Sequence, residues 1–380
     1  MISIPRTDAV TRSFALLAAC LLATACDGDP VAPGEEGPGL PRRYSLTVIE
    51  RPAGLQQMEL LPRAINASGQ VVLGSGYSGR TLVLWSGGSA TAFTAPYLAT
   101  ATGLDDSGRI VGCTGSVFGQ GEQRPLLGEA GRLWYLAGAG LERACARAVA
   151  SRGTVVGEAG PAGRERAFVL EAGRVTLLDV PGDSTSQAVA VNAAGHVAVN
   201  SQRTVAPLPN EPASVVRASL WRGGALVPLG HLDSPAAGPG QVADPSRFSH
   251  IARDLNDRDE VVGDSWGMVC TADRSACGSR MRAFLWRGGR MTDVGRDLPV
   301  DASSAVAVNR WGHVLVQGYS GRTPVPFLWH EGRVLNLAEA VAATGWRLTG
   351  VHDLNDAGQV VATAQNTATG AFAAVRLDPA

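Results

Sequence analysis

Apolar and polar positions alternate over short segments through most of this chain, and turn residues separate the segments. From residue 44 onward the same order recurs: an apolar strand, a turn of the form Asn/Asp-x-x-Gly, a Val-rich strand, a loop, a strand ending near Leu-Trp, a glycine and a last strand. Short segments with a period of two positions, bounded by such turns, are typical of half-buried β-strands. The pattern predicts an all-β chain built from one repeated unit.

The turn that joins the first two strands of the unit occurs seven times. The first residues of these turns lie on average about 48 residues apart, and they are Asn66, Asp105, Ala150, Asn192, Asn256, Asn309 and Asn355. Asn or Asp at the first position can accept a backbone N–H, and Gly at the last position can adopt a positive φ. Six of the seven turns keep this Gly, and Asp259 replaces it in the fifth. Four-stranded repeats of about 40 to 50 residues predict propeller blades.

The ends of the repeated region predict how the ring of blades closes. The seventh unit stops after residues 371–377 without an outermost strand, while an unassigned strand at 44–50 precedes the first unit. An open ring would expose strand edges, which is an aggregation hazard. We expect the strand at 44–50 to complete the seventh blade, which gives a seven-bladed β-propeller with four-stranded blades over residues 44–380.

The first 25 residues have the features of an export signal. The apolar run 13–25 follows Arg6 and Arg12 and is too short for a membrane-spanning helix of about 20 residues. It ends in Ala-Thr-Ala-Cys26, which resembles the lipobox of bacterial lipoproteins, in which the cysteine is acylated and becomes the mature N-terminus. Cys26 is therefore the predicted lipidation site. Cys20 is the alternative site, and an ordinary cleaved signal is a third alternative.

Residues 26–43 are rich in Pro, Gly and acidic residues and have no apolar periodicity, so we expect a disordered, lipidated tether. Acyl chains contribute about 0.8 kcal/mol per buried CH₂, enough for firm anchoring when several are attached. The prediction is a protein anchored through lipid on the extracytoplasmic side of the bacterial cell envelope, at the outer membrane or cell surface rather than the inner membrane. Asp27 would favour inner-membrane retention under the enterobacterial sorting rule, which leaves the leaflet open.

The charge balance narrows the range of partners. The chain has 33 Lys+Arg and 34 Asp+Glu residues, a formal net charge of −1, and every one of the cations is Arg. A nucleic-acid binder needs a concentrated cationic face, so we expect no nucleic-acid partner. A hydrophobic fraction of 45% is enough for a large core, and we expect a monomer.

The four cysteines beyond the N-terminal region predict disulfides, since their number is even and the chain reads as exported. Cys270 and Cys277 flank a single loop, and Cys113 and Cys145 lie in units that would be neighbouring blades. The chain contains no Cys-x₂-Cys pair, so its cysteine spacing does not indicate a zinc site. The acidic segment that begins at Asp254 lacks the calcium-loop pattern, because its fifth position is Arg258. We expect no metal and no cofactor.

Aromatic residues recur in the third strand of most units, for example at Trp85, Phe168, Trp286 and Trp329, and this recurrence favours a packing role between blades. Segments such as 254–263, 282–286 and 291–295 resemble the HAF-type probable extracellular repeat, which is bacterial, exported and functionally uncharacterised. The resemblance covers about residues 60 to 376. That repeat is named after a His-Ala-Phe tripeptide. This chain departs from it at the position of the His, where it has Arg166, Arg282 and Pro326, so no role of that His is carried over.

Three connecting segments that are longer than in the other units lie on one face of the predicted ring. Segments 200–216 and 264–281 join second to third strands, and segment 231–250 joins two blades, all around blades four and five. Long connections on a rigid scaffold are where recognition usually occurs. The candidate ligand-binding residues on this face are His231, Arg247, Phe248, His250 and Trp266; the alternative is that these segments are solvated insertions without a partner.

The sequence contains no set of residues that indicates catalysis. Ser78 and Ser320 lie in two copies of Gly-Tyr-Ser-Gly-Arg-Thr, which lacks the last Gly of a nucleophile elbow and points to internal duplication. We therefore expect a binding or interaction module with no catalytic residues, whose partners are the membrane, through the anchor, and an envelope glycan or protein. The alternatives are a polysaccharide-active hydrolase or lyase, and a structural envelope protein without a specific ligand.

Overall fold

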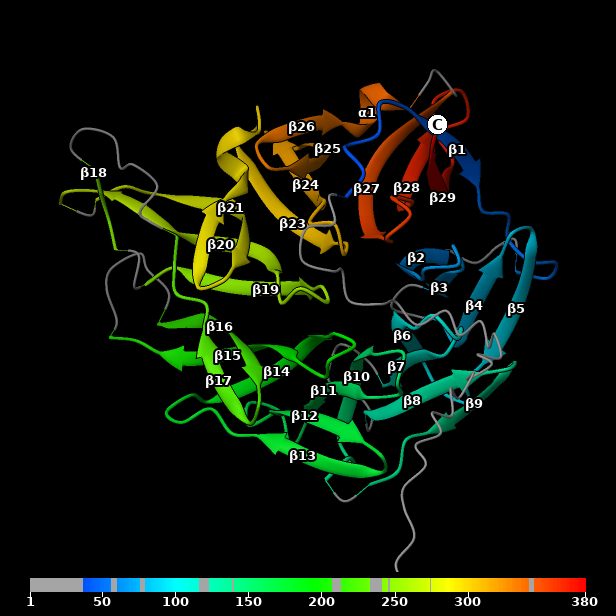
Figure 1. Ribbon diagram of the computed structural model, residues 1–380, viewed down its shortest axis with the longest axis horizontal. Helices are drawn as coiled ribbons and strands as arrows, with labels where there is room; N and C mark the ends of the chain where they lie inside the picture. The colour runs from blue at the N-terminus through cyan, green and yellow to red at the C-terminus, as the bar shows by residue number, and fades with distance from the viewer. Residues whose placement is uncertain are drawn as a thin grey trace, which may run out of the picture.

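The computed structural model describes residues 37–55, 60–75, 79–115, 123–138, 140–206, 213–232, 241–244, 247–273, 275–341 and 345–380. Within them the chain forms seven antiparallel sheets arranged as a ring, with successive sheets built from successive stretches of chain (Figure 1). This confirms the predicted seven-bladed β-propeller. The signal segment, Cys20, Cys26 and residues 27–36 of the tether lie outside the described residues.

The first three blades are regular four-stranded meanders, each with its first strand nearest the centre (Figure 1). Blade one contains β2 (Leu60–Ile65), β3 (Val71–Ser75), β4 (Thr81–Ser86) and β5 (Ser89–Thr94). Blade two contains β6 (Ala99–Leu104), β7 (Ile110–Thr114), β8 (Arg124–Glu129) and β9 (Arg132–Tyr135). Blade three contains β10 (Ala144–Val149), β11 (Val155–Ala159), β12 (Arg166–Glu171) and β13 (Arg174–Leu178).

Blades four to six continue the pattern with longer strands. Blade four contains β14 (Thr185–Val191), β15 (Val197–Thr204), β16 (Ser214–Arg222) and β17 (Ala225–Pro228). Blade five contains β18 (Gln241–Ala243), β19 (Ser249–Leu255), β20 (Val261–Thr271), β21 (Cys277–Arg287) and β22 (Arg290–Asp293), followed by a 3-10 turn at Val294–Asp297. Blade six contains β23 (Ala302–Val308), β24 (Val314–Ser320), β25 (Thr323–His330) and β26 (Arg333–Asn336), and a single helical turn, α1 (Leu337–Ala340), follows it.

Both ends of the chain contribute to blade seven. Its strands β27 (Trp346–Leu354), β28 (Val360–Asn366) and β29 (Phe372–Pro379) are completed by β1 (Tyr44–Val48), which pairs antiparallel with β29. The side chain of Tyr44 is 2% exposed and its hydroxyl donates a hydrogen bond to the Gly358 carbonyl at 3.0 Å. The predicted closure of the ring by the N-terminal strand is thus confirmed.

The core lies between neighbouring blades. The recurrent aromatic residues of the third strands are buried there: Trp85, Phe168, Phe284, Trp286, Phe327 and Trp329 are each at most 5% exposed. Rings of this size fill the wedge between adjacent sheets, so the packing role predicted for them is confirmed. Among the described residues no helix is both long and apolar enough to cross a membrane.

The meander gives the ring two different faces. The turns between first and second strands all lie on one face, which we call the turn face. The connections between second and third strands, and those between blades, lie on the opposite face, which we call the loop face. The described residues of the expected loops 200–216 and 264–281 are largely strand, because the pairing of β15 with β16 and of β20 with β21 extends beyond the length of the shorter blades.

Candidate functional site

One side chain from each blade lines the axis of the ring. In every blade the pairing of the first and second strands shifts at a β-bulge. The extra residues are Arg63, Thr102, Arg147, Val189, Arg253, Val306 and His352, and all seven line one axial cavity of about 270 Å³. Because a bulge redirects a side chain, these positions set the chemistry of the channel.

Two of the three channel arginines have carboxylate partners. Arg147 forms a two-pronged interaction with Glu158, with its Nη2 and Nε at 2.6 and 2.9 Å from the two carboxylate oxygens. Arg253 donates from Nε to Asp264 at 2.5 Å. Both carboxylates are largely buried, at 9% and 3% side-chain exposure. Their charges are therefore balanced by the arginines, and these two channel positions are electrically close to neutral.

Arg63 differs from the other two. Its side chain is half-buried, its Nε atom is buried without a hydrogen-bond partner, and none of the ion pairs among the described residues includes it. The neighbouring His352 ring bonds through Nε2 to the Thr363 hydroxyl at 2.6 Å. Burial, and then the charge of Arg63, lower the pKa of His352 to about 4. His352 is therefore neutral at neutral pH, and Arg63 carries the unbalanced charge.

Two carboxyl groups beside the channel link blades rather than face a ligand. Asp353 accepts hydrogen bonds from the backbone N–H groups of Ile65 and Leu354, both at 2.8 Å. Asp254 does the same for Val308 and Leu255. Burial raises the pKa of both carboxyl groups, and for Asp353, where the charge of Asp254 adds to it, the value is about 7.

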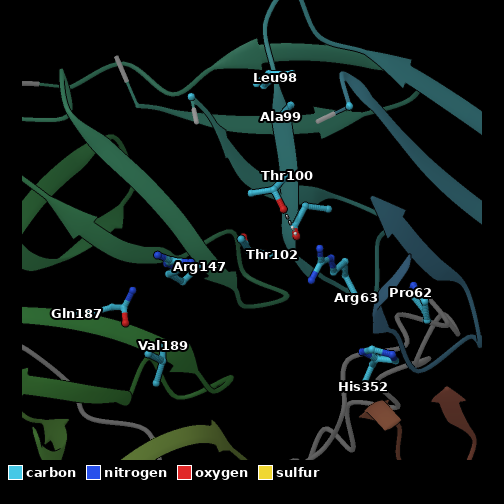
Figure 2. A pocket seen from close by; sticks show the side chains of 13 residues that line it. Pro62, Arg63, Leu98, Ala99, Thr100, Thr102, Arg147, Gln187, Val189 and His352 are labelled. Carbon is cyan, nitrogen blue, oxygen red and sulfur yellow. Dashed lines mark hydrogen bonds between the residues drawn. The ribbon is translucent and has the colours of Figure 1, made fainter. Parts of the chain in front are cut away.

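The channel widens at the loop face into two cavities that share Arg147 and Gln187. The first, of about 490 Å³, lies against the first strands of blades one and two (Figure 2). In Figure 2, Arg63 and His352 lie on one side of it, and Arg147, Gln187 and Val189 lie on the other. The second, of about 480 Å³, lies between blades three and four. Both volumes are in the range of about 300–1,000 Å³ that small-molecule sites occupy.

The turn face is closed by hydrogen bonds between blades. The side-chain amide of a turn Asn donates to the backbone carbonyl of the corresponding residue in the next blade: Asn192 to Asn256, Asn256 to Asn309, Asn309 to Asn355, Asn355 to Asn66 and Asn66 to Asp105. The next turn residue in three blades, Asp106, Asp257 or Asp356, accepts a backbone N–H from the preceding blade. These contacts fix the turns around a cavity of about 200 Å³ on the turn face. This cavity is smaller than either of the two on the loop face.

The five candidate ligand-binding residues lie at the loop-face side of blades four and five, and they differ in exposure. His231 is exposed, and Arg247 and Trp266 are half-buried, whereas Phe248 and His250 are 3% and 1% exposed. The Phe248 ring packs so closely on Gly267 that a Cβ there would lie 2.0 Å from it. The His231 and His250 rings stack at 6.3 Å. Ligand contact by this group stays a prediction, and Phe248 and His250 offer almost no surface for it.

The axial residues are not among those predicted from the sequence, although a sequence signal for them exists. Each lies three positions before the first residue of its turn, so the seven repeats carry Arg, Thr, Arg, Val, Arg, Val and His at that position. A variable position beside an otherwise regular repeat indicates a role outside the common packing. Alternation alone could not reveal it, because the bulge interrupts the period of two.

Both predicted disulfides are present. Cys113 of β7 bonds to Cys145 of β10 and joins blades two and three, and Cys270 bonds to Cys277 across the β20–β21 hairpin. Within the described part of the chain, no group of three or more His, Cys, Asp or Glu side chains is arranged to hold a metal ion.

Comparisons with known proteins bear on the fold alone. No family model and no curated protein sequence matches the chain. The β-propeller domain of the Trilobed protease from Pyrococcus furiosus aligns over 90% of this chain and 95% of its own length, with a TM-score of 0.54 and 11% identity. Polysaccharide lyase Uly1 aligns over 86% of this chain and 91% of its own length, with a TM-score of 0.50 and 8% identity. Acylaminoacyl peptidase aligns over 84% of this chain but only 51% of its own, with a TM-score of 0.51 and 13% identity.

Proposed function

We propose that this protein is a lipid-anchored, extracytoplasmic binding module of the bacterial cell envelope, and that its ligand binds where the central channel opens on the loop face. The observation that carries the proposal is the pair of adjoining cavities there, lined by polar side chains of five blades. The two disulfides support an oxidising, extracytoplasmic compartment. The lipobox-like segment ending at Cys26 supports anchoring.

The contacts of the N-terminal segment support an orientation for this module. The ring nitrogen Nε2 of His313 lies 2.8 Å from the Pro38 carbonyl oxygen, and Gly37 lies against the Trp311 ring. Both partners belong to the turn face of blade six. Ten residues, 27–36, separate Gly37 from Cys26, and the eleven steps between these two residues, at about 3.3–3.6 Å each, reach at most about 40 Å. An anchor at Cys26 would hold the turn face toward the membrane and the loop face away from it.

Anchoring and binding are tested separately. Palmitate labelling of cells that express the wild type and Cys26→Ser should show label only in the wild type; undiminished label in Cys26→Ser would move the anchor to Cys20.

For binding, Thr100→Trp fills the first cavity, and Thr91→Trp, on the exposed outer strand β5, is the matched control. Small envelope-derived glycans and peptides are titrated in a thermal-shift assay, and a ligand that stabilises the wild type and Thr91→Trp but not Thr100→Trp supports the site. Equal stabilisation of Thr100→Trp would place binding elsewhere.

The enzymatic alternative is a polysaccharide-active hydrolase or lyase that uses carboxylates of the same face. It rests on Glu158 and Glu165, which both line the second cavity. Turnover of a glycan that Glu165→Gln abolishes would favour the enzyme over the binding module. Glu165 is the informative position, since Glu158 is held by Arg147.

A further inference from the structure

The charge at Arg63 is the one feature of the channel that the fold leaves uncompensated. Arg63 is the bulge residue of β2, and its Nε is buried without a hydrogen bond. A buried N–H group without a hydrogen bond costs free energy. At the two equivalent positions, Arg147 and Arg253, the guanidinium pairs with a buried carboxylate. Arg63 has no such partner among the described residues, and this difference calls for an explanation.

The groups around Arg63 do not supply the missing negative charge. His352 is neutral at neutral pH, because its pKa is about 4. The carboxyl group of Asp353 is engaged by two backbone N–H groups, and no ion pair among the described residues joins it to Arg63. Glu158 is held by Arg147 and by the side-chain amide of Gln187. Of the two arginines that line the first cavity, Arg63 is therefore the one without a carboxylate partner among the described residues.

We propose that the first cavity binds a small ligand through one carboxylate group, which pairs with the guanidinium of Arg63. This deepens the binding function proposed above and rests on it. A carboxylate matches a planar guanidinium and brings the one negative charge that the cavity lacks. A phosphate monoester, with nearly two negative charges, would need a second free cation, and Arg147 is already paired with Glu158. Thr100 and Thr102, on β6 next to the strand of Arg63, also line this cavity. Their hydroxyl groups already donate to backbone carbonyls, so they can accept hydrogen bonds from the rest of the ligand.

The test uses the full-length protein purified in detergent and isothermal titration with four probes. D-glucuronate and N-acetyl-L-alanine carry the carboxylate from a sugar acid and from an amino acid, and D-glucose and glucose 6-phosphate are the neutral and doubly charged comparisons. We expect one or both carboxylates to bind, and the stronger of the two identifies the source. Arg63→Gln should weaken that binding about 10- to 100-fold, as expected for one charge-assisted hydrogen-bonded pair. Arg333→Gln, an exposed arginine on β26, is the matched control and should bind as the wild type does.

A melting experiment without ligand separates lost binding from misfolding. Because Arg63→Gln removes an uncompensated charge, its melting temperature should equal or exceed that of the wild type; a lower value would contradict the premise. The proposal is wrong if neither carboxylate binds, if Arg63→Gln binds them unchanged, or if glucose 6-phosphate binds more tightly than both. If D-glucose binds as tightly as D-glucuronate and Thr100→Trp abolishes both, the channel mouth is still a binding site, but not for a carboxylate.

Discussion

Replacing Asn355 by Ala tests the hydrogen bonds that close the turn face. Asn355 lies where blade seven meets blade one. Its side-chain amide donates to the Asn66 carbonyl at 2.9 Å and to Oε1 of Gln359 at 2.8 Å, and its side-chain oxygen accepts the Gln359 backbone N–H at 2.9 Å. The side chain is buried in this position, with the residue 6% exposed. Ala keeps the turn backbone and removes all three hydrogen bonds.

The expected cost follows from what each lost bond leaves behind. A hydrogen bond contributes about 1 kcal/mol net, and a buried donor left unpaired costs about 1–3 kcal/mol. The Asn66 carbonyl still accepts from the Gly69 N–H, and the Gln359 side chain still bonds to Asp378. The Gln359 backbone N–H loses its partner. The free energy of unfolding should therefore fall by about 2–4 kcal/mol.

The assay is urea unfolding at 25 °C, followed by tryptophan fluorescence, with Asn366→Ala as the matched control. Asn366 also lies in blade seven, and its side-chain oxygen accepts the backbone N–H groups of Ala368 and Thr369 within its own exposed turn. Asn366→Ala should lower the free energy of unfolding by no more than about 1 kcal/mol. Such extrapolations resolve differences of roughly 0.5 kcal/mol. If the two variants lose the same free energy of unfolding within this limit, the contact between blades is not what stabilises the ring.

Three further predictions concern closure, the inter-blade disulfide and pH. Tyr44→Ala removes a buried ring from the seam and should cost about 3–5 kcal/mol in urea unfolding, by analogy with other aromatic-to-Ala changes in cores, whereas a loss under 1 kcal/mol would argue against closure by β1. Replacing Cys113 and Cys145 together by Ala opens a loop with a sequence separation of 32 and should lower the free energy of unfolding by about 3–4 kcal/mol. Unfolding of the wild type with and without reductant would check this value. Burial and the charge of Asp254 raise the pKa of Asp353 from 3.8 to about 7, so folding favours its protonated form. Its contribution to stability is full below pH 4 and is lost as the pH rises to 7; Asp353→Asn should flatten this slope, and an unchanged pH profile would contradict the assignment.

The turn residues show how far sequence reasoning reached. The Asn-x-x-Gly pattern predicted the turns because the contact that forms them is local: the side-chain oxygen of Asn256, for example, accepts the backbone N–H groups of Arg258 and Glu260. The same side chain also donates its amide to Asn309 in the next blade, 53 residues away. That second contact exists only once the blades form a ring, so no local pattern could reveal it.

Blade three shows how the ring tolerates an exception to this pattern. Ala150 stands where the other turns have Asn or Asp, so its side chain cannot donate to blade four. The contact one blade earlier, where the Asp105 carboxylate likewise cannot donate, is made by Arg109 of blade two. Its Nη2 donates to the Ser151 carbonyl at 2.8 Å, and Asp105 holds its guanidinium at 2.6 Å. The sequence predicted the turn at Ala150 from its Gly alone, and the substitute contact needed the structure.

The positions that repeat and the positions that vary have different roles in this ring. The turn residues recur in nearly every blade and connect it to its neighbours, so a change there acts on the whole fold. The bulge residues differ from blade to blade, and two of the three arginines among them, Arg147 and Arg253, come with their own buried carboxylate. A purely structural requirement would either pair Arg63 in the same way or replace it with a small or apolar residue, as Thr102, Val189 and Val306 show is possible. An unpaired charge that the scaffold does not require, at the wall of its first loop-face cavity, is most simply explained by what that cavity binds.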